Sequence, residues 1–173
     1  MIHVRRASVT LLMLAFHSAI AFGQATQSAT PASEVLLTVG GEVERPLKLT
    51  AENIAKLPRR SVRAKDHDGK EVTFEGVELG EILKLAGVPS GEKLRGKSLA
   101  LFLVIDAADS YRAVFALPEL DHAFTERVVL LAERRDGKPL SGNEGRLRVV
   151  VPDEKRQARW VRQVISLTIR RAE

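Results

Sequence analysis

The sequence contains no cysteine, and this absence excludes several kinds of chemistry. Without a thiol the protein forms no disulfide, has no thiolate nucleophile and offers no thiolate ligand to a metal ion. Histidine is also scarce: of four in 173 residues, only His67 and His122 lie beyond the N-terminal segment. A zinc site of the usual His/Cys kind therefore cannot be assembled from them without carboxylates.

Sequence motifs for common enzyme classes are also missing. There is no Gly-x-Ser-x-Gly elbow, no Walker loop and no Gly-x-Gly-x-x-Gly after a predicted strand, and the stretch 91–98 shares only its last letters with a phosphate loop. Aromatic residues make up 5% of the chain, with Trp160 as the single tryptophan. The pI of about 9.8 is typical of nucleic-acid binders. However, residues 146–171, where the basic residues are concentrated, hold a single aromatic, and residues 1–23 have the pattern of an export signal. Both observations argue against that function.

The first 23 residues have the pattern of a secretory signal peptide. Arg5 and Arg6 precede a mostly apolar run at 7–22, and the small-x-small cleavage site is Ala21-Phe22-Gly23. The run is too short to span a bilayer comfortably, so we expect a cleaved signal and a protein that does not span the membrane. General secretion and twin-arginine export both stay open. We therefore predict a periplasmic or secreted protein with a disordered leader at 24–34 and one domain at 35–173.

Positive charge is concentrated near the C-terminus. Removing residues 1–23 takes away Arg5 and Arg6 and no acid, leaving 25 basic against 22 acidic residues, a net charge of +3. The segment 146–171 alone carries +6, because it holds Asp153, Glu154 and eight basic residues: Arg146, Arg148, Lys155, Arg156, Arg159, Arg162, Arg170 and Arg171. Two interpretations remain open, a basic edge hairpin kept soluble by arginine and a site for an anionic ligand.

Short apolar runs separated by turn residues predict an α+β fold. We expect about eight strands and no regular strand–helix alternation, with the strands at 35–39, 61–65, 70–74, 99–105, 111–117, 128–132, 149–151 and 164–169. Residues 43–49 are expected to continue the first strand as an extended pair across Gly40-Gly41. Gly76 is expected to end the strand before it. Short helices are expected after Thr50, a good N-cap, and from Leu79 to just before Gly87, with a helical turn at 118–124. The prediction is a single domain with mixed β-sheets or a partial barrel and a few short helices.

Acidic residues in the predicted turns are interpreted as backbone caps. Asp66-His67-Asp68 is the most metal-like triplet, but neighbouring turn residues seldom converge on one ion. The same interpretation applies to Asp109 and to Glu119 with Asp121, and Trp160 is expected to anchor the core.

Several short sequence motifs, taken in their order along the chain, resemble one known family. They are Asp66-His67-Asp68-Gly69, Phe74-Glu75-Gly76-Val77-Glu78-Leu79, Ala107-Ala108-Asp109-Ser110-Tyr111-Arg112, Ala116-Leu117-Pro118-Glu119-Leu120-Asp121, Asp136-Gly137-Lys138-Pro139-Leu140, Leu147-Arg148-Val149-Val150-Val151-Pro152 and Arg159-Trp160-Val161. The order resembles the oxidoreductase molybdopterin-binding domain, which has the sulfite oxidase fold, and in particular its small exported members. The resemblance covers about residues 35–169.

The resemblance implies molybdopterin as the cofactor, and the sequence departs from the family at the metal. In the full enzymes one protein cysteine binds molybdenum, and the matching stretch here, 62–67, has none. The family's Pro-Gly-x-x-Gly turn is also changed, to 152–156. We expect no thiolate-bound metal and no protein metal site. The catalytic residues are unknown.

Three functions remain open on the sequence. The first is a binding module for a pterin-like anion or for a periplasmic redox partner, with the predicted pocket residues His67, Arg148, Lys155, Arg156 and Arg159. The second is an oxidoreductase whose molybdenum is held by the cofactor alone, with Asp66 or His67 near the metal. The third is a binder of anionic surfaces that uses only the arginine face.

Overall fold

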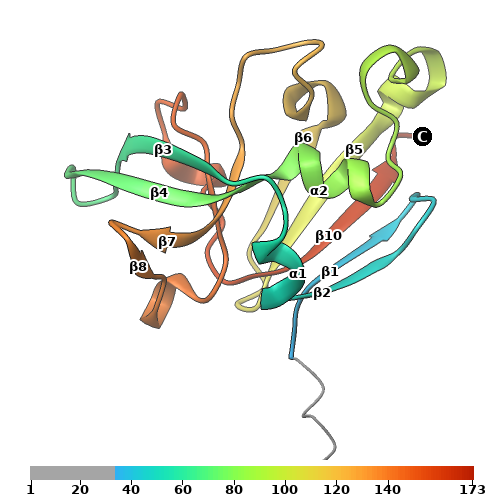
Figure 1. Cartoon of the computed structure of the whole chain (residues 1–173). Helices are drawn as coiled ribbons and strands as arrows, with labels where there is room; N and C mark the ends of the chain where they lie inside the picture. Colours follow the sequence, from blue (N-terminus) through green and yellow to red (C-terminus); the bar gives the residue numbers. More distant parts are fainter. Residues whose placement is uncertain (1–33) are drawn as a thin grey trace, which may run out of the picture. The chain divides into compact units, whose positions relative to one another are not determined.

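Ten strands in two sheets form the framework of residues 34–173, the part of the chain that this computed structural model describes (Figure 1). The first sheet contains, in spatial order, β2 (Leu47–Thr50), β1 (Val35–Gly41), β10 (Val164–Arg171), β5 (Leu101–Ala107) and β6 (Arg112–Ala116). It is mixed, because β1 and β10 run parallel and the other neighbours antiparallel.

The second sheet is antiparallel throughout. Its strands are β3 (Arg60–Lys65), β4 (Glu71–Glu78), β7 (Leu130–Arg135) and β8 (Lys138–Pro139), and β9 (Arg148–Val150) also pairs with β7. The expected α+β fold with mixed sheets is confirmed, in the form of two separate sheets. The predicted signal peptide and positions 24–33 of the predicted leader lie outside the described residues. Glu34, the last leader position, accepts a hydrogen bond from Arg146.

Two short helices begin and end where the sequence predicts. α1 (Ala51–Ala55) follows Thr50, whose hydroxyl accepts from the Asn53 N–H while the Asn53 side chain accepts from the Thr50 N–H. α2 (Leu79–Leu85) is followed by Gly87 at φ +79°, and the Gly87 N–H donates to the carbonyl of Lys84. Among the described residues, no helix is long and apolar enough to span a membrane.

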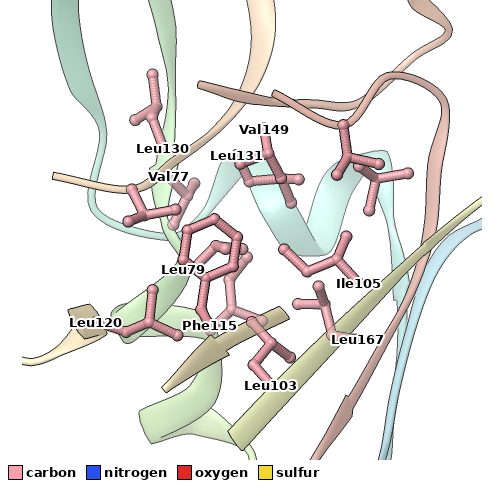
Figure 2. Close-up of a cluster of buried hydrophobic side chains, with 14 of the residues drawn as sticks. Val77, Leu79, Leu103, Ile105, Phe115, Leu120, Leu130, Leu131, Val149 and Leu167 are labelled. Atoms are coloured by element: carbon pink, nitrogen blue, oxygen red, sulfur yellow. The ribbon is translucent and has the colours of Figure 1, made fainter. Parts of the chain in front are cut away.

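The hydrophobic core is assembled from both sheets and α2 (Figure 2). Its labelled members include residues with no measurable exposure: Leu103, Ile105, Phe115 and Leu167 from the first sheet, Val77, Leu130, Leu131 and Val149 from the second, and Leu79 from α2. Burying apolar side chains of this size stabilises the fold by roughly 1.5–3 kcal/mol each. The core therefore holds the second sheet, which carries the candidate site, in a fixed position within residues 34–173.

The interpretation of the basic C-terminal segment as an edge hairpin is wrong. β9 belongs to the second sheet, whereas β10 is the middle strand of the first, between β1 and β5. β9 is buried throughout, and β10 buries Val164, Leu167 and Ile169. Each strand packs its buried side chains into the core from its own sheet. The connecting residues 151–163 therefore cross between the sheets, and they carry three of the segment's seven arginines, Arg156, Arg159 and Arg162.

The prediction that Gly76 ends its strand is also wrong, because β4 continues through it to Glu78. The ladder between β4 and β7 has a register shift between Glu75 and Gly76, and the two backbones come very close there. A Cβ at Gly76 would lie 2.0 Å from the carbonyl oxygen of Leu131 and 2.7 Å from the Cα of Ala132. The glycine is needed for this close approach and not for a turn.

We predict that Gly76→Ala lowers the free energy of unfolding by roughly 1–3 kcal/mol, because backbone atoms must move to admit the methyl group. Urea unfolding followed by Trp160 fluorescence would measure it. Gly40→Ala is the matched control, since Gly40 lies in β1 and a Cβ there meets nothing within 4 Å. Equal stability of the two variants would contradict the close-approach interpretation.

Candidate functional site

A cleft of about 1070 Å³ lies beside β3. One wall is β3 with the turn after it, and the other is the crossing segment 152–162, with Asp109 and Tyr111 at one end. Cationic residues are numerous on both walls: Arg63, Lys65, Lys155, Arg156 and Arg162, in addition to His67. Most of these cations come from two stretches that are far apart in the sequence and that the fold brings together.

None of these five cations has a carboxylate within 4.0 Å among the described residues. The acids of the cleft are mostly engaged elsewhere. Asp66 pairs with arginines beneath the cleft, Glu154 pairs with Arg159, and Asp109 accepts the Tyr111 N–H. Glu71 is the one acid of the cleft wall with no such partner. The cleft therefore has an excess of uncompensated positive charge.

Asp66 forms the floor of the cleft and is held by two arginines. Its Oδ1 accepts from Arg148 Nη2 at 2.7 Å and from the His67 N–H at 2.8 Å, and its Oδ2 forms an ion pair with Arg135 Nη1 at 2.8 Å. Arg148 also donates to Glu144. Asp66 is 6% exposed and Arg148 not at all, so charges of both signs are buried together.

Aromatic rings enclose the Arg148 guanidinium. Its central carbon lies 5.1 Å from the centre of the Phe74 ring and 5.3 Å from that of Trp160, and the two rings meet edge to face. Arg148 Nε has no hydrogen-bond partner. Trp160 itself is 4% exposed and donates from Nε1 to the carbonyl of Val151. The predicted core role of Trp160 is confirmed, and its edge also lines the cleft.

Two pKa values at the floor follow from this geometry. Burial alone would raise the pKa of Asp66, but the hydrogen bonds from Arg148 and the His67 N–H, with the charges of Arg148 and Arg135, lower it below its usual value. Burial and the charges of Arg162 and Arg148 lower the pKa of His67, against an opposing effect of Asp66. At neutral pH the cleft floor therefore has an ionised carboxylate beside a neutral imidazole.

The structure brings together three of the five residues predicted to form the pocket. His67, Lys155 and Arg156 line the cleft, and their role as ligand contacts remains a prediction. Arg148 and Arg159 do not line it. Arg148 lies beneath the floor, while Arg159 stacks on Phe115 at 4.1 Å and pairs with Glu119 and Glu154. Both arginines are occupied by internal carboxylates.

The predicted caps are mostly confirmed. Asp68 accepts from the Lys70 N–H, Asp109 from the Tyr111 N–H, Glu119 from the Ala116 N–H, and Asp121 from the N–H of Ala123. No three metal-binding side chains of the described residues cluster as a metal site. Asp66 is the exception, because its carboxylate pairs mainly with arginines. We call Asp66, Arg135, Arg148 and Glu144 together the ion network.

Sequence reasoning did not place several charged residues in the site, among them Arg162, which it counted only in the basic segment. Arg135 and Glu144 complete the ion network from positions that look like ordinary loop flanks. Arg63 and Lys65 belong to the cleft and are both exposed in β3. Their i, i+2 spacing in a predicted strand was a usable signal, since it places both side chains on one face.

The residues of the cleft fit only part of the cofactor that the resemblance implies. Unpaired cations suit a phosphate and other anionic groups, and Tyr111 and Trp160 add aromatic surface. A protein bond to molybdenum does not fit: there is no thiol in the sequence, and both Asp66 oxygens are engaged by arginine. The set of donors therefore matches an anionic organic ligand and not a metal.

Comparison with known proteins places the chain in a family. The family model of the oxidoreductase molybdopterin binding domain matches residues 24–173. Among solved structures, the sulfane dehydrogenase SoxCD from Paracoccus pantotrophus matches with a TM-score of 0.60 and 24% identity, which shows a shared fold. The match covers 77% of this chain but only 37% of that one, and no curated protein matches significantly. The chain belongs to the oxidoreductase molybdopterin binding domain family and is a cysteine-free member of it.

Proposed function

We propose that the protein is an exported binding module that holds an anionic, pterin-type ligand in the cationic cleft and makes no bond to molybdenum. The observation that carries the proposal is the set of five unpaired cations around a space of about 1070 Å³. Arginine and lysine form charge-assisted hydrogen bonds to phosphate, and such bonds are roughly twice as strong as neutral ones. A pterin that carries a phosphate combines this charge with a planar ring.

The cleft offers binding groups for each part of such a ligand. Lys155, Arg156 and Arg162 lie on the crossing segment and Lys65 on β3, so an anion between the walls would meet cations from both sides. The Tyr111 ring is 49% exposed, and its hydroxyl is fixed by donating to the Ala158 carbonyl at 2.6 Å. A fixed aromatic face at the end of the cleft suits a planar heterocycle.

A second candidate is an oxidoreductase in which the cofactor alone ligates molybdenum. It is favoured by family membership and by His67, a neutral imidazole exposed at the cleft. Such an enzyme would still lack the protein ligand that holds the metal in the full enzymes of the family. The engagement of Asp66 by Arg148 and Arg135 favours the binding module.

Export is part of the proposal and rests on the N-terminal sequence. Arg5 and Arg6, the apolar run and the small-x-small site are typical of a secretory signal. A fusion of residues 1–30 to a reporter that is active only in the periplasm would test it. A reporter that stays inactive in the cytoplasm would contradict the export proposal.

Purification from a molybdenum-replete host that synthesises the cofactor would separate the two candidates. We expect the protein to bind a pterin phosphate and to contain much less than one molybdenum per chain by elemental mass spectrometry. One molybdenum per chain would overturn the binding module. A protein that binds neither pterin phosphate nor inorganic phosphate would overturn the anionic-ligand proposal itself.

A further inference from the structure

The outer edge of β3 has backbone groups with no partner. Within residues 34–173, β3 pairs only with β4, so one of its edges is open there, and Figure 1 shows β3 at the end of its sheet. Which of its backbone groups point outward follows from its neighbour. The N–H of Thr73 donates to Asp136 Oδ1 and its carbonyl accepts from the Asp136 N–H, so both Thr73 groups point away from β3.

Thr73 is the register partner of Arg63, and this fixes the direction of the Arg63 backbone. In an antiparallel ladder, opposite residues alternate between hydrogen-bonded and non-hydrogen-bonded pairs. In a non-hydrogen-bonded pair, the backbone N–H and C=O groups of both residues point away from each other. The N–H and carbonyl of Arg63 therefore face the open edge, as do those of Ser61 two residues earlier. Neither residue has a backbone partner outside the ladder among the described residues.

Lys65, two residues after Arg63 in β3, also has an outward-facing carbonyl. The carbonyl of Lys65 accepts a hydrogen bond from the side-chain amide of Gln157 on the opposite wall. An amide already occupies the outward position at one end of this edge. The positions at Ser61 and Arg63, farther along, are open, and Arg63 borders both the cationic cleft and a second cleft of about 1020 Å³.

The charges of the side chains along this edge indicate which kind of strand could pair with it. Ser61, Arg63 and Lys65 are exposed on one face of β3, and no carboxylate of the described part of the chain pairs with Arg63 or Lys65. Opposite charges directly across two strands stabilise the pair, whereas like charges destabilise it. A second copy of this chain would place its own arginine and lysine against these, so a copy is disfavoured and an acidic strand is favoured.

We propose that the open edge of β3, at Ser61 and Arg63, binds an extended acidic segment of a partner protein as an added antiparallel or parallel strand. The partner's backbone satisfies the outward groups of Ser61 and Arg63, and acidic side chains at alternate positions face Arg63 and Lys65. The Val62 side chain and the exposed Phe124 ring line the second cleft and supply apolar surface for the intervening side chains. This site shares Arg63 and Lys65 with the cationic cleft, but its hydrogen bonds come from the backbone of Ser61 and Arg63, so a change at Ser61 tests it separately from the pterin-type ligand.

A labelled nine-residue peptide in which glutamate alternates with valine tests the proposal by fluorescence anisotropy, with lysine in place of glutamate in a second peptide. We expect the glutamate peptide to bind more tightly. Ser61→Pro removes an outward N–H without removing a ladder bond, and we expect it to weaken binding roughly tenfold. Ser61→Ala keeps the N–H and is expected to bind like the unchanged protein. Arg63→Glu is expected to reverse the preference between the two peptides.

Several results would overturn the proposal. Equal binding to Ser61→Pro and Ser61→Ala would mean attraction by surface charge without strand addition, and absence of binding to the folded protein would remove the site. Self-association that Ser61→Pro abolishes, seen by sedimentation, would assign the edge to a second copy. Hydrogen exchange offers a check that needs no variant, since the glutamate peptide should slow exchange at the Ser61 and Arg63 amides. Ser61→Pro should still bind pterin phosphate, so the two proposals fail separately.

Discussion

Arg148→Met is expected to lower the free energy of unfolding by about 3–5 kcal/mol, the range for removing one partner of a buried ion pair. Arg148 has no exposed surface, and it donates to both Asp66 and Glu144. Methionine fills a similar volume between Phe74 and Trp160 but leaves the Asp66 carboxylate with Arg135 alone. Urea unfolding followed by Trp160 fluorescence measures the loss.

The pH dependence separates this electrostatic cause from lost packing. Asp66 has a lowered pKa in the folded protein, so its contribution to stability is present above its unfolded pKa and is lost as pH falls through the folded pKa. The stability difference between the unchanged protein and Arg148→Met should therefore shrink as the pH falls below the ordinary aspartate pKa of about 4 and through the lowered pKa of folded Asp66. A difference that stays constant with pH would assign the loss to packing.

Two further variants complete the test. Adding Asp66→Asn to Arg148→Met removes the uncompensated charge, so the double variant should be less destabilised than the sum of the two single changes. Arg170→Met removes an arginine that is exposed in β10 and pairs with no carboxylate that the structure describes, and it should change stability by less than about 0.5 kcal/mol. A similar loss for Arg170→Met would contradict a special role of the buried network.

Arg156→Glu and Lys155→Glu are each expected to weaken the binding of a pterin phosphate by roughly 10–100-fold, the range for losing a hydrogen bond to a charged group. Both residues line the cleft and pair with no carboxylate of residues 34–173, so the reversal removes an attraction and adds a repulsion. The quenching of Trp160, whose ring borders the cleft, would report binding. Binding should also weaken with salt, because the cleft is open to solvent.

Arg170→Glu is the matched control, since it changes the net charge equally but lies outside every described cleft. It should leave binding within about twofold if the contact is local, because a distant exposed charge is screened over roughly 10 Å. Inorganic phosphate and unphosphorylated pterin should each bind more weakly than the combined ligand. Equal effects of Arg156→Glu and Arg170→Glu would mean that only the overall charge of the protein matters, which is the anionic-surface alternative.

Local structure could be predicted because local bonding decides it. Thr50 caps α1 with groups three residues away, Gly87 ends α2, and the β3–β4 hairpin turns through Asp68 and Gly69. The sequence motifs, taken in order, also indicated the family, because they place such turns at characteristic spacings along the chain. The errors concern contacts between distant segments. Gly76 was expected to stop a strand but admits the β7 backbone. One interpretation of the basic segment paired its two apolar runs in a hairpin, but β9 and β10 lie in different sheets.

The sequence by itself determined the absence of any protein thiolate, the polarised charge, the strand pattern and the family. Only the tertiary structure decided what each charged residue does. Arg148 and Arg156 lie in the same basic segment, yet one is buried against Asp66 and the other is free at the cleft. The reason is physical: whether an arginine is available to a ligand depends on which carboxylates the folded chain brings within reach. The carboxylate that holds Arg148 is 82 residues away in the sequence.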